Sequence, residues 1–287
     1  MVEVPGGRVW YRIVGDGNST PLLTLHGGPG VPSAYLSSLA RLASDRPVIF
    51  YDQLGCGNSE RPNDRSLWTT ERFVAELAEV VAALDLSRFH LLGQSWGTML
   101  AVDYALTRPD GLVSLILASP ALSIPRWVAD AKRLIQELPA ETQASIERHE
   151  LAGTTADPEY QAAKDAYYAR HVCRLRPIPA GYAQAIATTG HDVYETMWGP
   201  SEFCATGTLL DYDRTDRLGE IAVPTLFTCG RFDEATPEAT AWYASLIPGA
   251  GVAVFKQSAH MPHLEEEEGY LATVSDFLRD VDAAQPR

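Results

Sequence analysis

Residues 89 to 102 of the chain spell FHLLGQSWGTMLAV, and this stretch decides the fold. Phe89 to Leu92 is continuously apolar and predicts a buried strand, while the apolar run that begins at Thr98 predicts a helix. The sequence Gly-Gln-Ser-Trp-Gly lies between them, at residues 93 to 97. It therefore places Ser95 on a tight turn between a strand and a helix.

Steric crowding explains why both flanking positions of this turn are glycine. On such a turn the serine backbone is strained, and the strand passes so close to the helix that a Cβ at Gly93 or Gly97 would collide. The Ser95 hydroxyl would then be exposed at the N-terminus of a helix, whose dipole favours developing negative charge. The same pattern also occurs by accident as a plain Gly-Ser turn. The interpretation therefore depends on whether partners of a nucleophilic serine occur elsewhere in the chain.

Two later loops contain such partners. A serine hydroxyl is a weak nucleophile near neutral pH, and it needs a base that is oriented by a carboxylate. Asp233 follows the predicted strand at 224 to 230, and His260 follows the predicted strand at 251 to 255. This order of serine, acid and histidine is typical of the α/β-hydrolase fold. Either residue could instead be an ordinary loop or core residue, and His263 is a competing base nearer the next helix.

The rest of the chain agrees with an α/β-hydrolase fold, in which a mostly parallel sheet has helices on both faces. Between about residues 124 and 198 helical segments follow one another without a convincing buried strand, which predicts an inserted all-helical cap. We expect a core formed by residues 1–122 and 212–287 and a cap formed by residues 123–211. The acidic run at 265 to 268 is interpreted as a solvated helix start. The predicted strands cover residues 8–14, 21–25, 47–51, 89–92, 113–117, 225–229 and 251–255.

A glycine-rich loop, HGGPG at residues 26 to 30, follows a predicted strand upstream of the serine turn. Such a loop could be a mere turn, but it can also present bare backbone N–H groups at the place where α/β-hydrolases hold a second oxyanion donor. We expect the oxyanion hole to consist of the backbone N–H groups of Gly28 and Trp96. Asp52, in another glycine-rich loop, is better explained as a residue that hydrogen-bonds within its own loop than as a catalytic acid.

Composition limits the possible functions. The chain has 287 residues, of which 46% are hydrophobic and 21% are charged, so it is globular. Its formal net charge of -14 repels phosphate backbones, and no nucleic-acid partner is expected. No metal cluster or phosphate loop is evident, so no cofactor is expected. No leader or membrane-spanning segment is evident either, which makes the cytoplasm the expected location. The cysteines are scattered and form no C-x-x-C pair: Cys56, Cys173, Cys204 and Cys229.

Several motifs together resemble the proline iminopeptidase (prolyl aminopeptidase) family of α/β-hydrolases, and the resemblance extends to the tricorn-interacting aminopeptidase of archaea. It covers nearly the whole chain. One departure is Thr98, where many relatives have a further glycine; Thr98 could alter packing behind Trp96 and thereby substrate preference. The matching motifs are HGGPG at 26–30, DQLGCGNS at 52–59, GQSWG at 93–97, GPSEF at 199–203, GRFDEATP at 230–237 and SAH at 258–260.

The resemblance implies release of an N-terminal residue, often proline, from short peptides. In this family two glutamates hold the free α-ammonium of the substrate, and the matching positions here are Glu202 and Glu234. An ammonium that is taken out of water is costly unless carboxylates pair with it. Without the resemblance, Glu202 would be interpreted as a solvated loop acid. The aromatic residues Tyr194, Trp198 and Phe203 could line a pocket for a pyrrolidine ring or could equally form the core of the cap.

Four functions remain open from the sequence. The leading one is a serine aminopeptidase that prefers proline or another small apolar residue and forms an acyl-enzyme on Ser95. An amidase acting on amino-acid amides such as prolinamide would use the same residues. An esterase or lactonase would not need a free amine, and a hormone-type receptor would bind with little turnover. Haloalkane dehalogenases and epoxide hydrolases are disfavoured because their turn carries aspartate. The sequence does not predict an oligomeric state.

Overall fold

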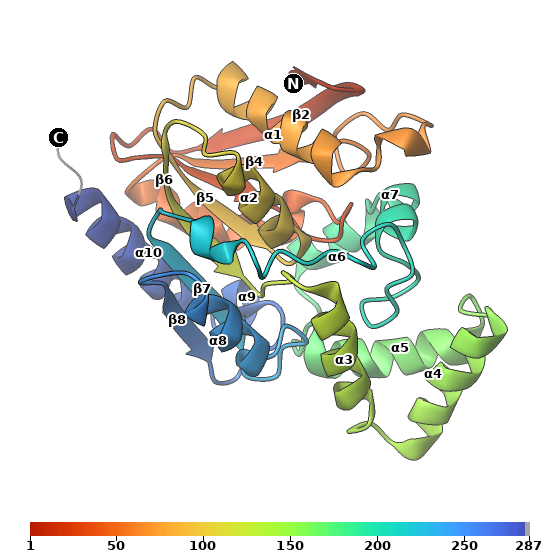
Figure 1. Ribbon diagram of the computed structural model, residues 1–287. Coiled ribbons are helices and arrows are strands. Elements are labelled where there is room, and N and C mark those ends of the chain that lie inside the picture. The colour runs from red at the N-terminus through yellow and green to blue at the C-terminus, as the bar shows by residue number, and fades with distance from the viewer. Residues whose placement is uncertain (285–287) are drawn as a thin grey trace.

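An eight-stranded sheet forms the centre of the protein in the computed structural model, which describes residues 1–284 (Figure 1). The strand order is β1-β2-β4-β3-β5-β6-β7-β8; β2 pairs antiparallel with β1 and β4, and the other pairs are parallel. The predicted α/β-hydrolase fold is confirmed, and β1 is a strand that the pattern did not predict. The strands are β1 (Val2–Val4), β2 (Gly7–Val14), β3 (Leu22–Leu25), β4 (Val48–Asp52), β5 (Phe89–Gln94), β6 (Leu112–Ala118), β7 (Thr225–Gly230) and β8 (Gly251–Phe255).

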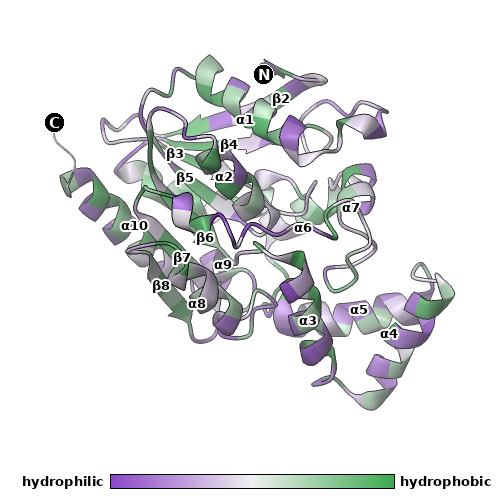
Figure 2. Cartoon of the chain, in the orientation of Figure 1, coloured by the Kyte–Doolittle hydropathy of each residue, from purple (hydrophilic) through white to green (hydrophobic). Residues whose placement is uncertain are grey.

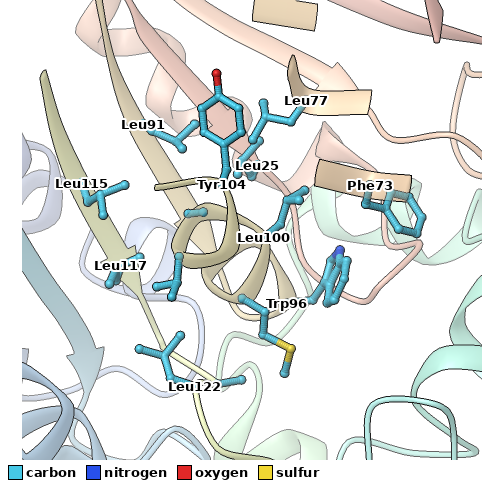
Figure 3. Close-up of a cluster of buried hydrophobic side chains, with 14 of the residues drawn as sticks. Leu25, Phe73, Leu77, Leu91, Trp96, Leu100, Tyr104, Leu115, Leu117 and Leu122 are labelled. Carbon is cyan, nitrogen blue, oxygen red and sulfur yellow. The ribbon is translucent and has the colours of Figure 1, made fainter. Parts of the chain in front are cut away.

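Helices cover the two faces of the sheet. Successive strand residues point to opposite faces, so Leu115 and Leu117 contribute to one hydrophobic core and Ile116 to the other. Figure 3 shows the first core, in which side chains of α2 pack between the strands and α1. The helices over that face are α1 (Thr70–Ala83), α2 (Trp96–Leu106) and α8 (Pro237–Ser245), and the opposite face is covered by η1, a 3-10 helix (Ser33–Ser44), and α10 (Glu267–Ala284).

Five helices occur between β6 and β7, in the segment for which a helical cap is predicted. Figure 1 shows α3, α4 and α5 together on one side of the sheet, with α6 and α7 nearer to it. In Figure 2 these helices carry more hydrophilic colour than the central strands. Helix α7 was not predicted. The five are α3 (Ile124–Ile135), α4 (Ala140–Ala152), α5 (Pro158–His171), α6 (Ala180–Ala187) and α7 (His191–Met197).

The carboxyl ends of the parallel strands place the important loops at one edge of the sheet. Leu25 pairs with Gly93, and Gln94 pairs with Ala118, so the loops after β3, β5 and β6 begin side by side. The loops after β7 and β8 follow at the same edge, because those strands are parallel to β6. The remaining short helices are η2 (Arg65–Leu67), η3 (Leu218–Glu220) and α9 (Pro262–Glu265). None of the helices within residues 1–284 is long and apolar enough to cross a membrane.

Candidate active site

Ser95 lies at the sharp turn between β5 and α2. Its backbone has φ 55° and ψ −121°, a strained conformation for a residue with a side chain. A Cβ on Gly93 would lie 2.1 Å from the carbonyl oxygen of Gly97, and a Cβ on Gly97 would lie 2.4 Å from the carbonyl oxygen of Leu25. The predicted collisions are therefore confirmed. Because α2 begins at Trp96, Ser95 lies at the N-terminus of this helix.

The structure brings Asp233 and His260 into direct contact. His260 Nδ1 lies 2.7 Å from Asp233 Oδ1, and both side chains are buried. The same Asp233 carboxylate accepts hydrogen bonds from the backbone N–H of Ala235 at 2.8 Å and from the Ser119 hydroxyl at 2.6 Å. These bonds orient the carboxylate toward the imidazole. Ser119 was missed by the sequence analysis, and its signal is weak, because a serine after a strand is common.

His263 occupies a different environment. Its ring is buried against the rings of Tyr35 and Tyr270, with centroid distances of 5.7 Å and 5.9 Å. Burial lowers the pKa of His263 to about 3, so this imidazole is neutral at ordinary pH. Within residues 1–284, the hydrogen bond that Asp233 makes to a histidine goes to His260 and not to His263.

The pKa of His260 is governed by opposing effects. Burial alone would lower this pKa, because it disfavours the charged imidazolium. The negative charge and hydrogen bond of Asp233, together with the charge of Glu202, outweigh burial and raise the pKa above its ordinary value. The surroundings of His260 therefore stabilise a proton on the ring, which favours a base that must hold a proton transiently.

The glycine-rich loop after β3 packs directly on the serine turn. A Cβ on Gly27 would lie 3.0 Å from the Cβ of Ser95. Gln53 fixes the loop, since its side chain donates to the carbonyl oxygen of His26 at 3.0 Å and accepts from the indole N–H of Trp96 at 2.8 Å. Gln53 thus connects the glycine-rich loop to Trp96, although the sequence analysis gave it no role.

The two expected oxyanion donors have free backbone N–H groups. In the hydrogen-bond network of residues 1–284, neither Gly28 nor Trp96 donates its N–H to a protein acceptor. Gly28 has φ +111°, a conformation that favours glycine. Asp52 behaves as its loop position predicts, because its carboxylate accepts hydrogen bonds from Ser33 at 2.6 Å and from the Asn58 side chain at 2.9 Å.

Two acids, Glu234, which is buried, and Glu202, which is half-buried, have buried carboxylate oxygens without a hydrogen-bond partner among residues 1–284. Glu234 is 2% exposed, and neither of its carboxylate oxygens has a hydrogen-bond partner within the described chain. Glu202 accepts a hydrogen bond from the Tyr194 hydroxyl at 2.9 Å through Oε1, whereas its Oε2 has no partner there. Burial raises the pKa of Glu202. Burial, followed by the charges of Glu202 and Asp233, raises the pKa of Glu234 well above its ordinary value.

Cap helices hold both glutamates near the histidine. At the end of α5, the carbonyl of His171 accepts the N–H of Glu234 at 3.3 Å, and the next carbonyl accepts the N–H of His260 at 3.1 Å. From α3, the Trp127 indole donates to the carbonyl oxygen of Glu202 at 2.8 Å, and its ring lies 5.8 Å from the His260 ring. Trp127 was missed because an aromatic residue on a predicted helix most often belongs to the core.

A cavity of about 680 Å³ lies in the cap beside Glu202. Its lining includes Tyr194, whereas Trp198 and Phe203 are buried in the protein interior. Tyr194 therefore lines a cavity, whereas Trp198 and Phe203 are core residues. Other residues that line the cavity include Val31, Tyr168, Tyr182 and Glu195.

The prediction of a solvated helix start at 265–268 is right for the second half of the run, where Glu267 and Glu268 begin α10, and wrong for the first half. The Glu265 carboxylate accepts the backbone N–H of Ala259 at 2.7 Å, and the Glu266 carboxylate accepts the hydroxyl of Ser258 at 2.6 Å. These two acids hold the loop that leads into His260. A run of glutamates at a helix start gives no signal for such contacts, because they depend on the path of a loop elsewhere.

Comparison with known proteins defines the class first. The model of the α/β-hydrolase fold family matches residues 20–267, so the chain is an α/β-hydrolase. Proline iminopeptidase of Heyndrickxia coagulans is 48% identical, over 98% of both chains, and that of Lactobacillus acidophilus is 40% identical over 95% of both. Within the α/β-hydrolases, the chain belongs to the proline iminopeptidase family.

Solved structures agree with this membership. The crystal structure of proline iminopeptidase from Mycobacterium smegmatis matches with a TM-score of 0.92 and 40% identity, covering 99% of this chain and 98% of that one. The structure of VinJ matches with a TM-score of 0.94 and 38% identity, covering 98% of this chain and 97% of the other. The resemblance to the family that the motifs indicate is therefore confirmed.

Proposed function

We propose that the protein is a serine aminopeptidase that releases an N-terminal residue, with proline as the first candidate, from short peptides. The observation that carries this proposal is the pair of acids Glu202 and Glu234, of which three buried carboxylate oxygens have no hydrogen-bond partner within the described chain. Buried acids of like charge are costly unless a ligand neutralises them. A substrate with a protonated α-amino group supplies that charge. The names of the similar proline iminopeptidases favour proline as the residue that carries it.

The proposed reaction begins with attack of the Ser95 hydroxyl on the first carbonyl of the substrate. His260 takes the hydroxyl proton, and Asp233 stabilises the imidazolium. The N–H groups of Gly28 and Trp96 hold the oxyanion, and loss of one such donor typically costs about 3–4 kcal/mol of barrier. His260 then protonates the leaving amine, and water releases the acyl group from Ser95.

Exopeptidase behaviour follows from where the glutamates lie. In this proposal they close one end of the site, so that a residue held by its ammonium group presents its own carbonyl to Ser95. Ser95 and His260 are only 6% and 4% exposed, so the leaving group must be short or the cap must open. An amino-acid amide such as prolinamide meets the same requirements and is the alternative substrate. The compartment we propose is the cytoplasm, in keeping with four unpaired cysteines.

A substrate panel tests this function. It compares proline, alanine and leucine arylamides with an N-blocked proline arylamide, prolinamide and a p-nitrophenyl ester. We expect hydrolysis of the free proline arylamide and a loss of at least 100-fold when its amine is blocked. We expect Ser95→Ala to abolish turnover of every substrate. Equal rates on blocked and free substrates would contradict the aminopeptidase function and would favour an esterase.

Matched variants locate the amine site. Glu234→Gln and Glu202→Gln keep the side-chain size but remove the charge, so each should raise KM for the proline arylamide by at least tenfold. Glu147→Gln is the control, because Glu147 is an exposed acid on α4. If prolinamide were cleaved much faster than any arylamide or dipeptide, the protein would be an amidase. If the ester were cleaved normally by both glutamine variants, the damage would be confined to amine binding.

A further inference from the structure

A second group of ionisable side chains lies in the cap, where α4 is joined to α5. His149 belongs to the last turn of α4, Asp157 is the residue before α5, and Glu159 lies in the first turn of α5. One nitrogen of the histidine and one oxygen of each acid lie within 4.8 Å of one another. Within residues 1–284, this is the single group of three such side chains with ligand atoms at that spacing.

His149 is the buried member of the group and points into it. The residue is 8% exposed, and its Nδ1 lies 2.7 Å from the Thr154 hydroxyl oxygen. Its Nε2 is buried and has no hydrogen-bond partner within the described chain. This nitrogen lies 3.6 Å from Glu159 Oε2 and 3.9 Å from Asp157 Oδ1, which is too far for hydrogen bonds. A histidine fixed through one nitrogen, with the other facing two carboxylates, has the arrangement of a metal ligand.

The spacing suits a transition-metal ion. Zinc binds imidazole nitrogen and carboxylate oxygen at about 2.0–2.2 Å, so ligand atoms that share one ion lie roughly 3–4 Å apart. The Nε2 distances to both acids are already in this range. Imidazole favours zinc, nickel or copper, whereas magnesium and calcium prefer oxygen ligands throughout.

The acids also have other partners, which leave room for an ion. Asp157 Oδ1 accepts the N–H of Glu159 at 2.8 Å and so caps α5. Glu159 pairs with the Arg148 guanidinium through Oε1, which leaves Oε2 toward His149. The competing explanation is a protonated His149 that attracts both carboxylates. An ion pair of that kind would not bind a metal ion at a stoichiometry of one per chain.

We propose that His149, Asp157 and Glu159 bind one zinc ion, or a similar transition-metal ion, as a structural site of the cap. Gly153 and Thr155, in the turn between the ligands, line the cavity beside Glu202. An ion at this place would join the end of α4 to the start of α5 and hold the turn that forms the cavity wall. The site takes no part in the chemistry at Ser95, so it stands independently of the proposed peptidase function.

Calorimetry tests the site directly. Full-length protein, treated with EDTA and dialysed, is titrated with zinc chloride and, separately, with magnesium chloride. We expect saturable binding of one zinc ion per chain and no comparable binding of magnesium. His149→Gln and Glu159→Gln should each weaken zinc binding by at least tenfold. The controls, His191→Gln and Glu147→Gln, remove an exposed histidine and an exposed acid of the same cap and should bind zinc normally.

Two further readouts distinguish the possible sources of binding. A cobalt(II) complex of this site should lack the near-ultraviolet charge-transfer band of a thiolate ligand, because the proposed ligands are nitrogen and oxygen. Zinc at about 100 times its dissociation constant should raise the melting temperature of the wild type by about 5 °C, and that of Glu159→Gln by about half as much or less. Absence of saturable zinc binding, or binding that is unchanged in both ligand variants, would overturn the proposal and leave an ion pair only.

Discussion

The side-chain amide of Gln94 donates a hydrogen bond to the backbone carbonyl of His260 at 3.1 Å. The carbonyl oxygen of the same amide accepts the Tyr35 hydroxyl at 2.5 Å, and that hydroxyl accepts the N–H of Gly27 at 2.7 Å. Gln94 thus links the histidine loop to the glycine-rich loop that packs on Ser95. All of these groups are buried, so removal of one leaves another unsatisfied.

Gln94→Leu should therefore reduce kcat. The variant keeps the bulk of the side chain but removes the acceptor of the Tyr35 hydroxyl and one of two donors to the His260 carbonyl, which keeps the Ser119 hydroxyl at 3.1 Å. We expect kcat on a proline arylamide to fall by about 10- to 100-fold, which corresponds to about 1.4–3 kcal/mol, with KM changed less than threefold. Steady-state kinetics of the folded variant, checked by circular dichroism, measures this.

A double-mutant cycle provides the control for the Gln94 network. Tyr35→Phe removes the other end of the same chain of hydrogen bonds, so its effect should be less than additive with that of Gln94→Leu. Strictly additive effects would show that the two residues act separately and that Gln94 does not position His260 through this network.

The acids Glu202 and Glu234 predict proton release when substrate binds. The pKa of Glu234 is raised well above its ordinary value by burial and by the charges of Glu202 and Asp233, so in the free enzyme this carboxyl group binds a proton more readily than an exposed glutamate does. An α-amino group, with a usual pKa near 8, is charged below that pH. Its positive charge favours the ionised carboxylates and lowers their pKa, so we expect release of up to about one proton per bound ligand.

Calorimetry of Ser95→Ala with prolinamide, in buffers of different ionisation enthalpy, measures that release. Glu234→Gln in the same background should abolish it, whereas Glu147→Gln should leave it intact. Uptake of protons, or release that persists in Glu234→Gln, would mean that the pair is already ionised and that its charge is balanced in another way.

Thr98 supports the serine turn more directly than the sequence indicated. Its hydroxyl donates to the carbonyl oxygen of Ser95 at 2.6 Å and accepts the N–H of Ala121 at 3.1 Å. Thr98→Val keeps the shape of the side chain but leaves the N–H of Ala121 without its acceptor; the Ser95 carbonyl loses one donor and keeps the backbone N–H of Thr98 at 2.8 Å. We expect it to lower the free energy of unfolding by about 1–3 kcal/mol, measured by denaturant unfolding. Thr98→Ser retains the hydroxyl and should lose under about 1 kcal/mol; an equal loss in both variants would attribute the effect to packing.

The parts of the site that depend on local sequence could be predicted, whereas those that depend on contacts between distant segments could not. The turn at Ser95 could be predicted because a side chain at either of its glycines would collide with nearby backbone. The loops of Asp233 and His260 could be predicted because parallel strands end at the same edge of the sheet. The apolar pattern predicts a helix over residues 240–247, and α8 begins three residues earlier, at Pro237. The Thr236 hydroxyl accepts the N–H of Ala239 and starts the helix with a proline at the next position.

Contacts between distant segments could not be predicted from the pattern. Ser119 has no sequence signal that links it to Asp233, and Trp127 has none that links it to Glu202. Such contacts depend on how cap helices lie over the sheet, which hydrophobic periodicity does not specify. The two glutamates were predicted only through the family resemblance, because burial without a partner is a property of the folded chain.

His90 predicts that the protein loses stability as the pH falls. It lies in β5, where its Nδ1 is 2.8 Å from the Ser114 hydroxyl and its Nε2 is 3.1 Å from Asp282 in α10. Burial, aided by the charge of Arg46 and opposed by that of Asp282, lowers the pKa of His90 to about 4. The unfolded chain, with a pKa near 6.5, then binds more protons than the folded chain between these two values. The contribution of His90 is full above pH 6.5 and is lost as the pH falls toward 4, a total of about 3 kcal/mol.

Urea unfolding at pH 7 and pH 5 measures this effect. Other buried histidines, such as His263, add to the pH dependence of the wild type, so the comparison is between variants. Between the two pH values, His90→Gln should lose about 2 kcal/mol less stability than the wild type. His191→Gln removes an exposed histidine and should follow the wild type. If His90→Gln also followed the wild type, His90 would keep an ordinary pKa in the folded protein, and its bond to Asp282 would be that of an imidazolium.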